Sequence, residues 1–150
     1  MAMGRFFLRM HSITKRNEKE RAGAVATFYG KEAGDKLFGL LAGHYGAIKE
    51  YLNASVAMDK TAKDAAVDKL KKNADEIAGF LSSANPKNWP KDTLVSLLIA
   101  HGGHHMAQID DLMAKDYAAE ATVWKAMSTH IDTIVDALAG GIEKQFPKKF

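Results

Sequence analysis

The sequence predicts an all-α protein, and three observations support this fold class. Four long segments carry apolar residues at helical spacing, and no segment alternates convincingly with period two. The three prolines, Pro86, Pro90 and Pro147, fall at the ends of these segments, where proline stops or starts a helix. We therefore expect one domain over residues 1–150. It would be an up-down-up-down four-helix bundle with an additional N-terminal helical segment, residues 1–23 of which are altered or loosely ordered.

Local signals mark where each helix begins and ends. Gly30 is a suitable C-terminal stop for a short first helix, and Asp59 is a suitable N-cap for the third. Asn85-Pro86 is a strong stop, and Pro90 suits the first turn of the helix that follows. The expected helices cover residues 18–29, 32–54, 60–83, 90–115 and 117–145.

Composition excludes several classes of function. The chain has no cysteine, so disulfides, thiolate metal sites and cysteine nucleophiles are absent. The net charge of +3 is small, and the basic residues gather near the two ends, which predicts no nucleic-acid partner. No apolar run approaches the roughly 20 residues needed to span a membrane, and the first residues lack a convincing signal-peptide cleavage site. These features predict a cytoplasmic protein.

Polar residues interrupt the apolar face of each long segment at a nearly constant interval. His44, Asn73, His101 and His130 each occupy a position where the pattern calls for a hydrophobic side chain. They are separated along the chain by 29, 28 and 29 residues. In an antiparallel bundle with a rise of about 1.5 Å per residue, this spacing places them within about one turn of the same height. We call these four residues the histidine layer.

Buried imidazoles must pair with one another, hold water or bind a ligand, because each unpaired polar group costs about 1–3 kcal/mol. Imidazole nitrogen is the commonest metal ligand, so the layer predicts a divalent transition metal, zinc or iron, held by His44, His101 and His130. Asn73 would orient a ligand or hold a water, and His105, one turn beyond His101, could add a nitrogen. His104 is expected to point away from the layer.

Two other interpretations remain open. The layer could be a purely structural device that fixes helix register in an interaction protein. Glycines beside the histidines, Gly43, Gly46, Gly102 and Gly103, suggest either close helix packing, which we favour, or room for a larger ligand such as haem. Apolar surface left open by an altered N-terminus would favour a homodimer.

Familiar catalytic motifs are missing. No glutamate is followed by histidine three residues later, as a ferritin-like di-iron site requires. There is no phosphate-binding glycine loop, nucleophile elbow or dinucleotide fingerprint. The sequence thus favours a binding or structural protein over an enzyme.

Two stretches carry a family resemblance, NADEIAGFLSSANP at Asn73–Pro86 followed by Trp89, and GIEKQFP at Gly141–Pro147. Over residues 24–150 the chain resembles a family of small prokaryotic helical-bundle proteins with no established activity. The resemblance implies a bundle fold and helix-borne histidines at positions matching His44, His101 and His130. Family members usually have a longer first helix with a Trp-x-x-His element. Residues 1–23 depart from that pattern, and His11 is the residue that could substitute.

Overall fold

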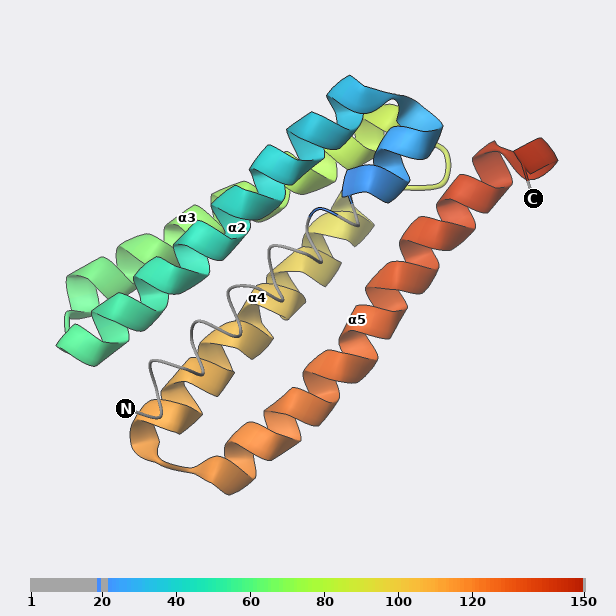
Figure 1. The fold of residues 1–150 in the computed structure, drawn as a ribbon. Helices are drawn as coiled ribbons and strands as arrows, with labels where there is room; N and C mark the ends of the chain where they lie inside the picture. Colours follow the sequence, from blue (N-terminus) through green and yellow to red (C-terminus); the bar gives the residue numbers. More distant parts are fainter. Residues whose placement is uncertain (1–18, 20–21, 150) are drawn as a thin grey trace. The chain divides into compact units, whose positions relative to one another are not determined.

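The computed structural model describes residue 19 and residues 22–149, so predictions about His11 and the first 18 residues lie outside the described part. Every regular element in the described residues is a helix, which confirms the predicted fold class (Figure 1). The chain separates into two compact units, Met1–Gly43 and His44–Phe150. The prediction of one domain stays a prediction.

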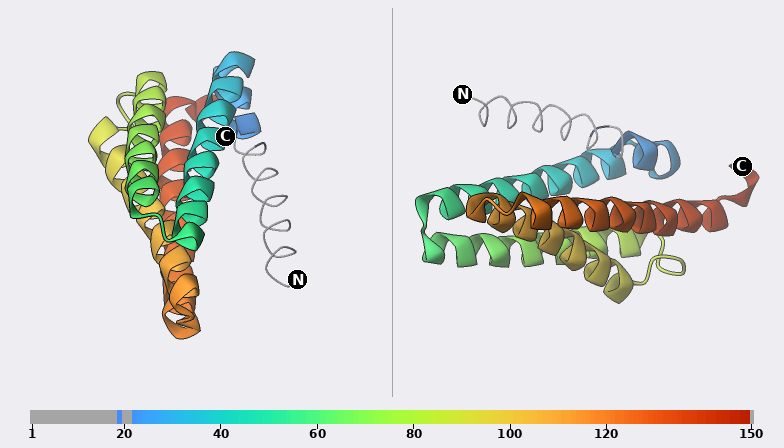
Figure 2. Two further views of the ribbon diagram at one scale, coloured as in Figure 1. Left: turned by 90° about the vertical axis from the view of Figure 1, so that its left-hand side faces the viewer. Right: turned by 90° about the horizontal axis from the view of Figure 1, so that it is seen from below.

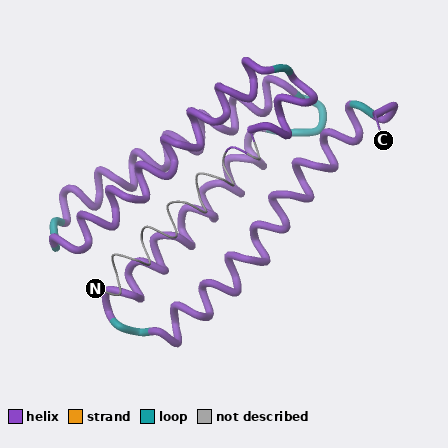
Figure 3. The backbone as a smooth tube through the Cα atoms, in the orientation of Figure 1, coloured by secondary structure: helices purple, strands orange, loops and turns teal. Residues whose placement is uncertain are grey.

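The helices begin and end close to the predicted residues. A helix over residues 22–29 is followed by α2 (Lys31–Ala57), α3 (Lys60–Ala84), α4 (Lys91–Ala114), α5 (Tyr117–Gln145) and the short 3₁₀ helix η1 (Pro147–Lys149). Only short loops separate them in the backbone trace (Figure 3).

Side chains and one proline account for the helix starts. Asp59 and Asp116 each accept a hydrogen bond from the backbone N–H three residues later, at 2.9 and 3.0 Å, and so cap α3 and α5. The predicted Asp59 cap is therefore confirmed. Pro90 lies one position before α4 and acts as its N-cap residue rather than as part of its first turn.

Within Met1–Gly43, two glycines explain how the chain turns into α2. Gly30 has φ = +92°, a conformation that glycine adopts without strain, and it ends the helix of residues 22–29 as predicted. A Cβ added at Gly34 would lie 2.7 Å from the Cβ of Ala26, so no larger residue fits there. The turn and the close approach both depend on the missing side chain.

Within His44–Phe150, consecutive helices run in opposite directions, and α3 packs on α4 and α4 on α5 (Figure 2). The packed centre lies along α3. Its buried residues recur at helical spacing, as the sequence predicts: Ala66, Leu70, Asn73, Ala74, Ile77, Ala78 and Leu81.

The loop between α3 and α4 is fastened to the end of α5. Trp89, only 1% exposed, donates its indole N–H to the carbonyl oxygen of Ala137 at 3.2 Å. Asn85 is also 1% exposed and donates to the carbonyl oxygen of Gly141 at 2.8 Å. These bonds satisfy polar atoms that burial would otherwise leave unpaired.

Most of α5 is less buried than its sequence predicts. Only Met127, Gly141 and Ile142 of this helix are buried, whereas Ile134 and Leu138, predicted to point inward, are half-buried. Trp124, predicted as a core or bundle-end anchor, is 50% exposed, and Leu112 of α4 is exposed as well. None of the described helices is long and apolar enough to cross a membrane.

Candidate functional site

The four histidine-layer residues come from four helices, and the structure brings them into a continuous chain of contacts. His44 lies on α2, Asn73 on α3, His101 on α4 and His130 on α5. The ring centroid of His101 lies 6.0 Å from that of His44 and 6.3 Å from that of His130, and both pairs are stacked. The prediction that these positions share a height is therefore confirmed for the three histidines.

His44 and Asn73 form the buried end of the layer. Both are more than 90% buried, and His44 Nδ1 lies 3.1 Å from Asn73 Oδ1. Because a carbonyl oxygen only accepts, Nδ1 of His44 carries the proton. The other ring nitrogen, Nε2, then holds a lone pair, and this buried atom has no hydrogen-bond partner among the described residues.

His101 and His105 form a second pair, one turn apart on α4. Their Nε2 atoms lie 3.2 Å apart, and their ring centroids 4.6 Å apart. The His105 centroid is also 6.5 Å from that of His44. Sequence spacing predicted that His105 could join the layer, and the structure places it in contact with His101.

His130 forms the end of the layer on α5. Its Nε2 lies 2.8 Å from the carbonyl oxygen of Leu97, so Nε2 donates and Nδ1 is the nitrogen left with a lone pair. The ring of His104 lies 5.4 Å from that of His130. The prediction that His104 points away from the layer is wrong. His101 and His104 lie about one turn apart on α4, and the rings of both lie near the ring of His130 on α5.

Burial keeps two of these imidazoles neutral at neutral pH. Burial lowers the pKa of His44, an effect that its bond to Asn73 opposes in part. Burial also lowers the pKa of His105, to about 4, and nearby His44 and His104 lower it further. A neutral imidazole retains a lone pair, which can bind a metal ion or accept a hydrogen bond from a ligand.

The arrangement is not a formed metal site. Within residues 22–149, no three His, Asp or Glu side chains converge as a bound ion would require. Two imidazoles on one tetrahedral zinc have nitrogens about 3.3–3.4 Å apart and ring centroids about 5 Å apart. The Nε2 atoms of His101 and His105 are near that separation, but the ring of His44 would have to approach by about 1 Å.

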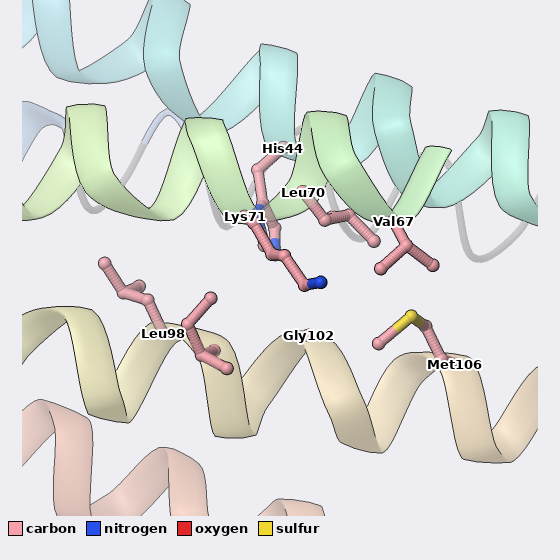
Figure 4. Close-up of a pocket in the computed structure, with 8 residues that line it drawn as sticks. His44, Val67, Leu70, Lys71, Leu98, Gly102 and Met106 are labelled. Carbon is pink, nitrogen blue, oxygen red and sulfur yellow. The ribbon is translucent and has the colours of Figure 1, made fainter. Parts of the chain in front are cut away.

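Three of the four glycines near the layer do not serve close packing, contrary to the favoured interpretation of the sequence. A Cβ added at Gly46, Gly102 or Gly103 would meet no heavy atom within 4 Å. Gly102 is nevertheless buried, and it lines a cavity of about 40 Å³ beside His44 (Figure 4). These positions therefore leave space rather than admit a neighbouring helix.

Sequence reasoning missed a second polar group, at the turn between α2 and α3. Asp110 accepts hydrogen bonds from the hydroxyl of Tyr51 at 2.9 Å and from the ammonium of Lys63 at 2.6 Å. The lysine also lies 4.8 Å from the centre of the Tyr51 ring. No short motif links these three residues, so the sequence offered no signal for them.

Comparisons with known protein families, curated proteins and solved structures found no match to this chain. The resemblance to a helical-bundle family stays a prediction.

Proposed function

We propose that this protein binds a divalent transition metal, zinc or iron, at the histidine layer. His101 and His105 would supply two nitrogens from one face of α4, and His44 the third. The carrying observation is the buried Nε2 of His44, which has no partner within the described residues while Nδ1 is held by Asn73. A carbonyl group that fixes the imidazole tautomer from behind is the usual support for a metal-binding histidine.

His130 is the third ligand predicted from the sequence, and zinc titration of His130→Leu tests whether it binds the metal. Its Nε2 is engaged by the Leu97 carbonyl, which leaves Nδ1 as the nitrogen that it could offer. A three-nitrogen site keeps an open coordination position, which the proposal assigns to water or a small ligand. Haem receives less support. Pockets for ligands of that size are typically about 300–1,000 Å³, whereas the cavity beside His44 is about 40 Å³.

Zinc titration of chelator-treated protein by calorimetry tests the proposal, with cobalt absorption as a reporter of tetrahedral geometry. We expect one metal per chain and at least 100-fold weaker binding in His101→Leu/His105→Leu. The matched control is His104→Leu, which removes a neighbouring imidazole outside the proposed ligand set and should bind as wild type. Asn73→Leu should weaken binding by about 10–100-fold. Failure to bind zinc, cobalt, iron and copper would reject the proposal.

A second candidate is a structural layer that only fixes helix register. It is favoured by the bonds that His44, His101, His105 and His130 already make to a protein atom. On this interpretation His→Leu at 44, 101 or 130 leaves stability unchanged or raised and removes no bound metal. Elemental analysis of untagged protein purified without chelator, repeated on the triple leucine variant, separates the two candidates.

The same proposal includes an up-down-up-down bundle, a cytoplasmic location and a homodimer. The bundle is supported by the reversal of direction between consecutive helices (Figure 2). Exposed side chains on α4 and α5, such as Met113 and Trp124, would be covered in a dimer. Light scattering after size-exclusion chromatography that shows only monomer would reject the dimer.

A further inference from the structure

A small cavity lies between α3 and α4 beside His44. Its volume is about 40 Å³. Val67 and Leu70 extend into it from α3, and Leu98 and Met106 face them from α4 (Figure 4). His44 supplies part of the wall from α2, so the cavity adjoins the buried end of the histidine layer.

The volume and lining of this cavity suit a small neutral molecule better than water. One water needs about 10–15 Å³ by this measure, so there is room for two or three heavy atoms. The cavity is partly open to solvent, because Lys71 and Ile99 in its wall are exposed. The surface that it offers is nevertheless apolar, so it supplies few of the two to four polar partners that hold an ordered water.

Gly102 keeps this space open. It is a buried glycine inside α4, where glycine costs about 1 kcal/mol relative to alanine. Close packing does not require it, because a Cβ there would meet no heavy atom within 4 Å. An alanine methyl at this position would occupy cavity volume instead.

We propose that the cavity bounded by His44, Leu70, Gly102 and Met106 binds a neutral diatomic molecule of the dioxygen or nitric oxide class. Binding in the cavity depends only on its shape and apolar wall. The position of that molecule next to a bound metal rests on the proposed function, in which His44 is a ligand.

Xenon, a neutral probe of similar size, tests the cavity in metal-free protein. We expect xenon pressure to produce saturable NMR shifts at the methyl groups of Val67, Leu70, Leu98 and Met106. Gly102→Ala should weaken this binding at least 10-fold. Gly103→Ala is the matched control, because it adds a methyl to the same helix outside the cavity and should bind xenon as wild type.

The outcomes separate this inference from the metal proposal. Saturable xenon shifts without zinc binding would support the cavity and reject the metal. Zinc binding without xenon shifts, or equal xenon affinity in Gly102→Ala, would overturn the cavity proposal. Should Gly102→Ala fail to fold, Val67→Ile fills the cavity from α3 and is expected to give the same loss.

Discussion

At both ends of the histidine layer a polar residue lies between two apolar residues of its helix, but the two ends differ in how deeply these residues are buried. On α3, Asn73 lies between Leu70 and Ile77, and all three are buried. On α5, His130 lies between Met127 and Ile134, of which only Met127 is buried. We call these the α3 side and the α5 side of the layer.

The difference follows from what each helix packs against. The buried face of α3 includes the small residues Ala66, Ala74 and Ala78, which allow neighbouring helices to approach closely. The middle of α5 packs mainly on α4, and its firm attachments lie near its C-terminal end, at Trp89 and Asn85. Asn73 on the α3 side is therefore enclosed by closely packed neighbours. His130 is only half-buried, and it is held by one backbone hydrogen bond and by the rings of His101 and His104.

The largest expected contrast comes from the same truncation on each side. Ile77→Ala should lower the free energy of unfolding by about 3–4 kcal/mol, because it leaves a cavity at a residue that is 2% exposed. Ile134→Ala removes a half-buried side chain and should cost about 1–2 kcal/mol. Urea denaturation measures both values. Equal losses would show that the α5 side is packed as firmly as the α3 side.

Acid should destabilise the metal-free protein through His105, which lies beside the histidine layer. The pKa of His105 is about 4 in the folded protein against 6.5 as the ordinary value, and His44, His101 and His104 surround it. Above pH 6.5 neither state binds a proton at this ring. Between pH 6.5 and about 4 only the unfolded chain does, so stability falls as the pH falls, by at most about 3 kcal/mol. Below that the loss levels off.

Urea midpoints measured from pH 7 to pH 4 test this prediction in the presence of chelator. His105→Leu should flatten the slope, because the leucine side chain does not titrate. His44→Leu should reduce the slope as well, because burial also lowers the pKa of His44. Indistinguishable slopes in the wild type and His105→Leu would contradict the assignment to His105.

Sequence periodicity predicted the helices and the height of the layer, because both depend on regular helix geometry. The start of α3 at Lys60 and the meeting of His44 with Asn73 follow from capping and spacing alone. Which ring touches which does not follow. Residues 101, 104 and 105 differ by a turn or less, and side-chain rotamers and the neighbouring helices decide that His105 meets His101 and His104 meets His130.

The role of the glycines and of Asn85 also could not be read from the sequence. A glycine that admits a neighbouring helix and one that leaves a cavity look identical in the chain, and at Gly102 the structure shows open space. Asn85-Pro86 was interpreted only as a helix stop. The bond from Asn85 to Gly141 joins residues 56 positions apart, which no local pattern indicates.

The C-terminal end of α5 should tolerate substitution much less than its middle. A Cβ added at Gly141 would lie 2.0 Å from the indole nitrogen of Trp89, so Gly141→Ala must displace Trp89 and break its bond to Ala137. We expect a loss of about 2–3 kcal/mol in the free energy of unfolding. Gly140→Ala is the matched control. Its Cβ meets no heavy atom within 4 Å, and it should gain up to about 1 kcal/mol from helix propensity. Tolerance of Gly141→Ala would mean that Trp89 does not anchor α5.

The smallest expected change in the free energy of unfolding comes from losing the hydrogen bond between His44 and Asn73 on the α3 side. Asn73→Ala removes the acceptor for His44 Nδ1 and leaves a buried donor, which should cost about 1–2 kcal/mol. Asn53→Ala, at an exposed position of α2, should stay within about 0.5 kcal/mol of wild type. Urea denaturation gives both values.

The double variant His44→Leu/Asn73→Ala should recover part of the loss, because it removes the donor as well. If the double variant loses the sum of the two single effects, His44 and Asn73 do not act as a pair, and Asn73 does not fix the tautomer of His44.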